Sequence, residues 1–195
     1  MKLIKVVSVF ALLTLLSCLK DRVLPSDPGS DPTPPPLADT IKALQINTLR
    51  INELVASGSN LPDEFGQSND WVEIFNPSFT RWVKLTGGKT FFSDNKGNPT
   101  KYTVSKDWFI PPRGFLIVFC NSRNTEGQFI NTSFGLSSSG EDFLIAYQDE
   151  AGGALVLVDE MTFLPYDFAK SIGLRPDGIG NTYLEMIMTP GAPNQ

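Results

Sequence analysis

The sequence predicts an all-β fold, either a sandwich or a small barrel. Short apolar runs alternate with turn-forming residues at nearly even spacing along most of the chain. No window of helical length shows an apolar stripe with a 3.6-residue period. The chain carries 14 Phe among 195 residues, so it has enough large apolar side chains to build a hydrophobic core.

The predicted strands lie between residues 46 and 188. They are Ile46–Val55, Trp71–Phe75, Trp82–Leu85, Thr90–Ser93, Tyr102–Ser105, Phe115–Cys120, Phe143–Tyr147, Leu155–Phe163 and Tyr183–Met188. Alternation places Trp71, Glu73 and Phe75 on one face of their strand and the two residues between them on the other. Phe115–Cys120 is continuously apolar, and its length and β-branched content favour a strand covered on both faces over a buried helix. Cys120 is therefore predicted to be a core residue.

The N-terminus is typical of a secretory signal. Lys2 and Lys5 precede an apolar run, Val6–Leu16, that is too short to span a bilayer. The run ends in Leu15-Leu16-Ser17-Cys18, which resembles a bacterial lipobox, so residues 1–17 are predicted to be a lipoprotein signal peptide. Acyl chains on Cys18 would then anchor the protein in a membrane. An ordinary secretory signal with an incidental cysteine is the alternative.

The residues after Cys18 suggest a location. Leu19 stands where Asp, in the sorting pattern that this resembles, would retain a lipoprotein at the inner membrane. Lys20-Asp21 resembles a short signal for export to the cell surface. The prediction is a lipid-anchored protein of the outer membrane of a Gram-negative bacterium, and the choice between its periplasmic and outer faces stays open.

Residues 18–40 are predicted to be a linker. This segment contains six prolines, which exclude both helix and sheet and favour an extended polyproline II chain. At its end, Asp39-Thr40-Ile41 resembles an O-glycosylation site of bacterial envelope proteins, with Thr40 as the acceptor; a chance tripeptide is the alternative. Residues 41–195 are predicted to form the folded domain.

Composition argues against several classes of function. The chain has no histidine, which removes the commonest general base and the commonest metal ligand. Its formal net charge is −5 and its pI about 4.7, so it lacks the basic surface that phosphate backbones attract, and a nucleic-acid partner is not expected.

A series of short motifs, in order, resembles the lamin-tail domain, a module of nuclear lamins that also occurs in bacterial secreted proteins. The motifs are Arg50-Ile51-Asn52-Glu53, Asp70–Asn76, Leu85-Thr86-Gly87, Phe92-Ser93-Asp94, Ile110-Pro111-Pro112, Phe134-Gly135-Leu136 with Gly140-Glu141, Arg175–Gly178 and Thr189–Asn194. The resemblance covers about residues 46–194. It implies an immunoglobulin-like β-sandwich and no enzymatic activity.

Catalytic and metal sites are weakly indicated. A serine nucleophile would need a base and an elbow motif that the sequence lacks. Glu53 and Glu73 are the best candidates for a carboxylate pair, yet both belong to the scaffold motifs. Asp94–Asn98 is predicted to be a hairpin turn, because Lys96 interrupts any calcium-loop pattern. Neither a metal nor a cofactor is predicted, although Asp63-Glu64 with Asn69-Asp70 leaves a weak calcium site open.

Two sets of side chains are singled out for structure and binding. A buried carboxylate needs a partner, so Arg175 is predicted to contact Glu73 or Glu53. Two polar connections, 57–69 and 121–132, are unusually long and are candidate binding loops. Phe65, beside Asp63 and Glu64, and Phe129 are either exposed anchors for a partner or buried caps on the domain.

The expected function is that of a non-enzymatic, lipid-anchored module of the cell envelope that binds a protein or a glycan. The alternative is an accessory domain for an extracellular nuclease or phosphoesterase, or for nucleic-acid binding, because bacterial lamin-tail domains also occur fused to such enzymes.

Overall fold

The computed structural model describes residues 41–42, 44–45, 48–150 and 152–195. These residues form strands and loops, and no helix occurs among them. The strands are β1 (Ile41–Lys42), β2 (Arg50–Val55), β3 (Asp70–Phe75), β4 (Trp82–Leu85), β5 (Thr90–Ser93), β6 (Tyr102–Thr103), β7 (Trp108–Ile110), β8 (Phe115–Cys120), β9 (Thr125–Glu126), β10 (Ile130–Asn131), β11 (Glu141–Gln148), β12 (Leu155–Phe163), β13 (Ser171–Leu174) and β14 (Tyr183–Met186). The all-β prediction is therefore confirmed.

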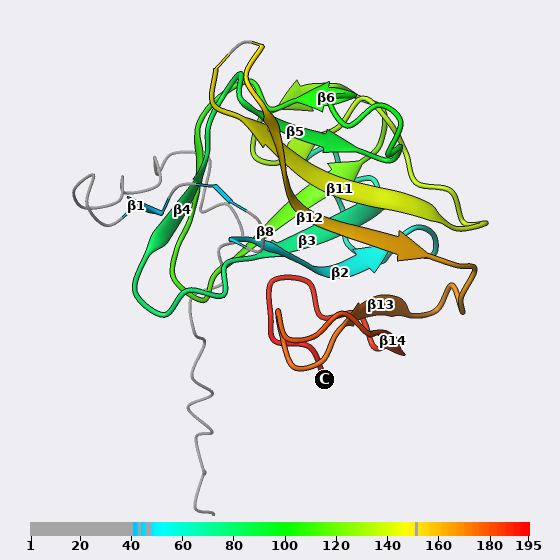
Figure 1. Cartoon of the computed structure of the whole chain (residues 1–195). Helices are drawn as coiled ribbons and strands as arrows, with labels where there is room; N and C mark the ends of the chain where they lie inside the picture. Colours follow the sequence, from blue (N-terminus) through cyan, green and yellow to red (C-terminus); the bar gives the residue numbers. More distant parts are fainter. Residues whose placement is uncertain (1–40, 43, 46–47, 151) are drawn as a thin grey trace, which may run out of the picture.

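The strands form three sheets. A seven-stranded sheet has the order β14-β13-β2-β3-β8-β10-β9, a four-stranded sheet the order β12-β11-β5-β6, and a three-stranded sheet the order β1-β4-β7. Pairing is antiparallel except between β1 and β4 and between β8 and β10. Figure 1 shows β11 and β12 crossing over β2, β3 and β8, with β13, β14 and the C-terminus gathered below them.

Most predicted strands are confirmed, and four of them, β4, β5, β8 and β12, have the predicted bounds. The sequence missed β1, β7 and β13, and it assigned β9 and β10 to a loop. β13 lacks a strong local signal because Gly173 lies at its centre. A Cβ atom at Gly173 would lie 2.7 Å from the carbonyl oxygen of Asn52, so only glycine allows β13 to approach β2 this closely.

One large hydrophobic core joins the sheets. Val72 and Ile74 of β3 contribute to it from the seven-stranded sheet, and Phe92 and Phe143 from the four-stranded sheet. Cys120 lies in the same core, as predicted, and burial raises the pKa of its thiol well above the usual range. The predicted alternation along β3 also holds, because Trp71 belongs to a separate cluster on the opposite face.

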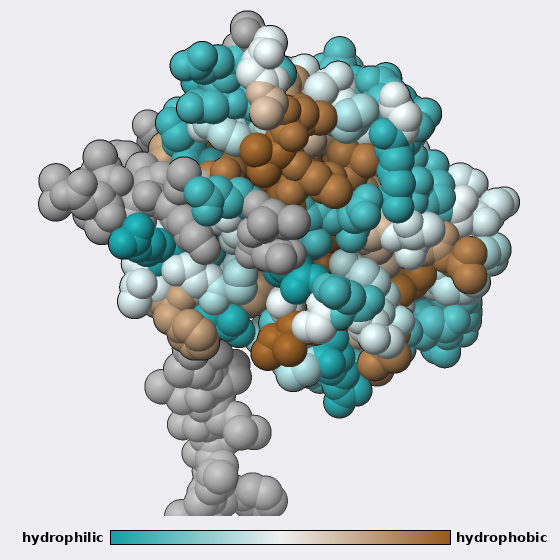
Figure 2. Space-filling model, viewed as in Figure 1, coloured by the Kyte–Doolittle hydropathy of each residue, from teal (hydrophilic) through white to brown (hydrophobic). Residues whose placement is uncertain are grey.

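The outer face of the four-stranded sheet carries a small apolar area. Phe91, Leu144 and Ala146 form a cluster there, and the exposed Leu157 pairs with Ala146 in the neighbouring strand. Figure 2 shows apolar side chains gathered over these strands. Within the described residues, no helix has the length and apolar character needed to cross a membrane.

Candidate functional site

The two long loops predicted from the sequence lie against each other. Arg123 of the second loop donates a hydrogen bond from Nη2 to Oε1 of Gln67 in the first, at 2.8 Å. Its Nε lies 3.5 Å from Oδ2 of Asp63. A second contact joins Asn131 Nδ2 to Glu64 Oε1 at 2.8 Å. The loops therefore form one continuous surface, called here the joined-loop surface and defined by residues 61–69 and 121–131.

Asp63 organises this surface from within. Its Oδ1 accepts hydrogen bonds from the backbone N–H groups of Phe65 and Gln67, both at 2.9 Å. Its Oδ2 accepts from Asn69 Nδ2 at 2.8 Å, and the side chain is fully buried. Because a buried carboxylate without donors is costly, these contacts hold the first loop in one conformation.

The same contacts bear on the calcium site that the sequence left open. Both oxygens of Asp63 accept hydrogen bonds from N–H groups. These donors stabilise the carboxylate and occupy the oxygens that a calcium ion would need. Of the other two acids of the set, Glu64 accepts a hydrogen bond from Asn131 Nδ2 at 2.8 Å, and Asp70 accepts the N–H of Leu136 at 3.2 Å. Among the described residues, no group of three His, Cys, Asp or Glu side chains could hold a metal ion.

Phe65 and Phe129, which the sequence treated alike, have opposite environments. Phe65 is 55% exposed, and the guanidinium of Arg123 lies 4.3 Å from its ring centroid. Phe129 is 6% exposed and packs edge-to-face on Phe119, with ring centroids 4.9 Å apart. Phe65 thus has the exposure expected of an anchor, whereas Phe129 is a buried cap.

Phe129 completes a second, smaller core on the outer face of β3 and β8. Its members are Val55, Trp71, Ile117, Phe119 and Phe129, with Leu61 and Met188 packed against them. Leu61 comes from the first long loop and Met188 from the C-terminal segment. Both segments therefore help to cover the outer face of β8, which its continuous apolar sequence predicted to be buried.

A buried polar cluster lies beside this second core. Glu53 Oε1 accepts the backbone N–H of Thr189 at 2.9 Å, and its Oε2 accepts the Thr189 hydroxyl at 3.0 Å. Glu73 accepts from Asn52 Nδ2 at 2.9 Å and from the backbone N–H of Gly191 at 2.6 Å. The two carboxyl groups therefore fasten the C-terminal segment to the sheet, and we call this set with Asn52, Asp177 and Asn194 the C-terminal latch.

The predicted ion pair between Arg175 and these glutamates is wrong. Arg175 is exposed, and within the described residues no salt bridge involves it, Glu53 or Glu73. Neutral donors take the place of the cation: amide and hydroxyl groups satisfy the carboxyl oxygens. The two buried acids do have partners, as burial requires, but these partners are neutral and not charged.

Burial without a cation shifts both glutamates in one direction. Desolvation raises the pKa of Glu73 well above its usual value, and the nearby Glu53 raises it further. Desolvation likewise raises the pKa of Glu53, against the opposing effect of its hydrogen bonds. Proton uptake by this pair is therefore favoured in the folded state.

A β-bulge brings Asn52 into the latch. Ile51 pairs with Ile74 and Glu53 pairs with Glu73, so Asn52 is the extra residue in β2. Its amide can then reach Glu73, while its Oδ1 accepts the N–H of Gly178 at 2.9 Å. Asn194 closes the set, because its Nδ2 donates to the carbonyl oxygens of Asn52 and Leu174.

The buried ion pair of the described structure lies elsewhere, between Arg50 and Asp159. Arg50 Nε lies 3.1 Å from Asp159 Oδ2, and both side chains are 9% exposed. The remaining guanidinium nitrogens donate to the carbonyl oxygens of Gly178 and Gly180. Arg50 opens the first motif of the sequence, but no local pattern indicates that its partner comes from β12.

Several separate motifs thus meet in one place. The hydrogen bonds described above join four parts of the chain that lie far apart in sequence. They are Arg50–Glu53, Glu73, Asp177-Gly178 and Thr189–Asn194. This supports a scaffold role for these residues. The predicted lipidation site, Cys18, and the predicted acceptor Thr40 lie outside the described residues.

No protein-family model matches the chain, and no curated protein and no solved structure matches it. A functional interpretation therefore depends on the chain's own residues.

Proposed function

We propose that this chain is a non-enzymatic, lipid-anchored protein of the cell envelope whose β-domain binds a protein or a glycan through the joined-loop surface. The proposed fold type is an immunoglobulin-like sandwich of the lamin-tail kind. The proposed anchor is the acylated Cys18, with residues 18–40 as the spacer between membrane and domain.

Two findings support the proposed fold type. The seven-stranded and four-stranded sheets contribute side chains to one shared core. Four of the eight motifs that carry the resemblance also meet at the C-terminal latch, although they are spread from Arg50 to Asn194. Motifs that interact in three dimensions are better explained by a common scaffold than by chance matches.

One observation carries the proposed binding role: Phe65 is exposed on a loop that is otherwise fixed. Asp63 holds the backbone of Phe65 and Gln67, and Arg123 covers part of the ring. A pre-ordered aromatic side chain loses little conformational entropy on binding, which makes it suited to anchor a partner. A planar ring beside a guanidinium suits either a protein side chain or the apolar face of a sugar.

The test compares two exposed phenylalanines. Phe79 is 81% exposed and also lies near a guanidinium, that of Arg113, at 5.1 Å. The Phe65→Ala and Phe79→Ala variants therefore make a matched pair. Wild type and both variants would be applied to a glycan array and to solubilised outer membranes, and captured partners quantified by mass spectrometry.

We expect a ligand that wild type and Phe79→Ala retain and that Phe65→Ala loses. Capture that is equal for all three proteins would contradict binding through Phe65. Equal loss in both variants would point to nonspecific adhesion through exposed aromatic rings, and the proposal would then be rejected.

The anchor is tested separately. Wild type should incorporate labelled palmitate and sediment with outer membranes, whereas Cys18→Ser should do neither, because the acylated sulfur is absent. Equal palmitate labelling of the two proteins would show that Cys18 is not the acylation site.

A further inference from the structure

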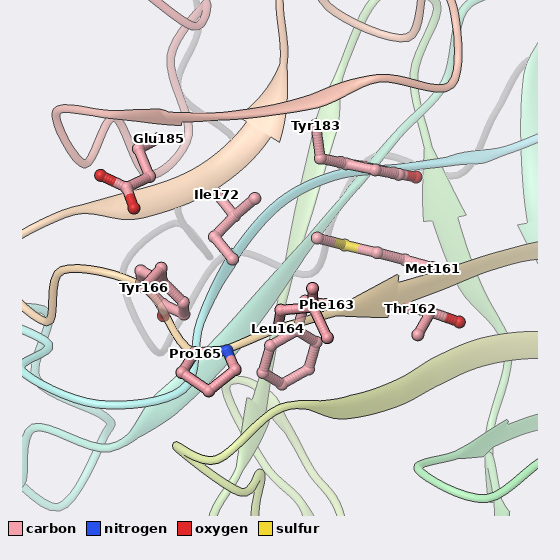
Figure 3. Close-up of a pocket in the computed structure, with 9 residues that line it drawn as sticks. All are labelled: Met161, Thr162, Phe163, Leu164, Pro165, Tyr166, Ile172, Tyr183 and Glu185. Atoms are coloured by element: carbon pink, nitrogen blue, oxygen red, sulfur yellow. The ribbon is translucent and has the colours of Figure 1, made fainter.

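A pocket of about 260 Å³ opens between the end of β12 and the strand pair β13–β14. Figure 3 shows Ile172, Tyr183 and Glu185 on one side of it, with Met161, Phe163 and Tyr166 opposite. A protein cavity of about 150 Å³ can hold benzene, so this space is large enough for one long side chain.

Most of the pocket wall is apolar, because the tyrosine hydroxyls are engaged elsewhere, and its polar side chains are Thr162 and Glu185. Tyr166 Oη accepts the backbone N–H of Ala56 at 2.7 Å. Tyr183 Oη donates to the carbonyl oxygen of Ile51 at 3.3 Å. The rings of both residues are thus left to line the pocket together with Phe163, which is nearly fully buried.

Apart from the tyrosines, the one ionisable side chain that lines the pocket is Glu185. Glu185 lies at the mouth with 44% of its side chain exposed, and no Lys or Arg side chain lines the pocket. Lys170 Nζ lies outside the lining, 3.1 Å from Glu185 Oε2 and 3.6 Å from Asp167 Oδ2. Lys170 thus shares its one ammonium group between Glu185 of the lining and Asp167 outside it, so these three side chains together keep a net negative charge.

This chemistry selects the charge of a ligand. An anion would meet Glu185 and no cationic side chain in the lining. The nearby Lys96, which donates to Thr162 Oγ1 at 3.0 Å, is itself paired with Asp142 and Glu160. A cation would meet a carboxylate and aromatic rings, which attract positive charge through their electron-rich faces. The apolar walls further require that the cation be carried on an aliphatic stem.

The rim indicates a polypeptide as the source of that cation. Leu164 at the mouth is 75% exposed, and Phe168, whose ring lies 6.3 Å from that of Tyr166, is 46% exposed. Apolar rim residues of this kind can contact the residues that flank an inserted side chain, whereas a free amine would leave them in water.

We propose that this pocket binds a lysine side chain of a partner polypeptide. The aliphatic stem packs between Ile172 and the rings of Phe163 and Tyr166, and the ammonium group reaches Glu185 in competition with Lys170. These residues do not overlap with the joined-loop surface, so this site stands independently of the proposed role of Phe65.

The experiment titrates the full-length protein, labelled at its methionine methyl groups, with three blocked peptides. The peptides are identical except for a central lysine, norleucine or glutamate. Binding in the pocket should shift the Met161 methyl resonance. We expect the lysine peptide to bind about three- to tenfold more tightly than the norleucine peptide, and the glutamate peptide not to bind, since partly exposed charge pairs contribute about 1 kcal/mol.

Variants define the mouth of the pocket. Glu185→Gln should reduce the preference for lysine over norleucine to about onefold, and Lys170→Ala should strengthen lysine binding by about threefold, because it removes the internal competitor. Glu150→Gln, which removes an equal charge outside the pocket, should leave both unchanged. Phe65→Ala should bind the lysine peptide as wild type does, which separates this site from the joined-loop surface.

Several results would overturn the proposal. They are equal binding of the lysine and norleucine peptides, an unchanged preference in Glu185→Gln, and no Met161 shift with any peptide. Binding of N-acetyl-lysinamide as tight as that of the lysine peptide would reject a polypeptide as the source, because the rim would then contribute nothing.

Discussion

On one face of strands β2 and β3, Ile51, Val72 and Ile74 pack into the large core against the opposite sheet. On the other face, Glu53 and Glu73 lie equally buried, but beneath the C-terminal segment. The first face is covered by apolar packing, which needs no particular partner atom. The second is covered by hydrogen bonds, which fix one segment in one register. The same two strands therefore form part of the core on one side and bind the chain's own C-terminal segment on the other.

The largest expected effect lies at the ion pair that joins β2 to β12. Arg50→Met leaves Asp159 buried without its cation and should lower the free energy of unfolding by about 3–5 kcal/mol. A double variant, Arg50→Met with Asp159→Leu, should recover much of that loss, because no unpaired charge remains. Urea unfolding measures both. If the double variant is as unstable as the sum of the two single variants, the pair is not the cause.

Next in size is the contrast between the two loop phenylalanines, Phe129 in the second core and Phe65 on the joined-loop surface. Phe129→Ala should cost about 3 kcal/mol or more through the cavity it leaves. Phe65→Ala should cost less than about 1 kcal/mol, since only a partly exposed cation–π contact is lost. Thermal melting of the two variants side by side checks the prediction, and equal losses would show that the two rings are not differently buried.

A smaller and more local effect is expected at the C-terminal latch. Asn194→Ala removes the donors to the carbonyl oxygens of Asn52 and Leu174 and should cost about 1–3 kcal/mol. Hydrogen exchange should accelerate at the amides of Thr189 and Gly191 while amides of β3 stay protected. The exposed Asn60→Ala serves as the control. Uniform acceleration across the sheet would show instead that the segment and the core unfold together.

The smallest predicted effect is on how steeply the stability of the protein changes with pH. Because burial raises the pKa of Glu53 and Glu73, the folded state holds protons that the unfolded chain releases above its ordinary carboxyl pKa of 4.5. Their contribution to stability is full below that pH and is lost as pH rises through the folded pKa values. Urea midpoints from about pH 5 to about pH 8 should therefore fall with a shallower slope in Glu73→Gln than in wild type. An identical slope in both proteins would exclude Glu73 as its source.

Local patterns predicted the strands well where apolar residues were dense. β8 is read directly from its apolar run, and its double coverage follows from the same run. β13 was missed because four residues around Gly173 carry little periodicity, and its strand character depends on pairing with β2 and β14. The bulge at Asn52 was not predicted either, since a bulge is defined by the pairing of two strands, here β2 and β3.

The candidate sites show the same division. The sequence identified the two long loops and Phe65, but it did not show that Asp63 and Arg123 would join the loops. The prediction that Glu53 and Glu73 need partners was combined with the choice of Arg175, because a side chain of opposite charge is the partner that a sequence shows most directly. The actual partners include the backbone N–H groups of Thr189 and Gly191. Nearly every residue has such a group, so the sequence does not indicate which of them will bind a carboxylate.

Local apolar patterning is enough to predict the all-β class, the alternation along β3 and the burial of Cys120, since any compact fold must respect that patterning. The cation that pairs with Asp159, the exposure of one phenylalanine and not the other, and the segment that covers Glu73 become visible only in the folded structure. Two of those outcomes depend on contacts between residues more than a hundred positions apart, Arg50 with Asp159 and Glu73 with Gly191, and the environment of Phe65 depends on the second loop, which supplies Arg123. The physical reason is that burial and hydrogen-bond partners are properties of the packed chain, whereas periodicity is a property of its segments.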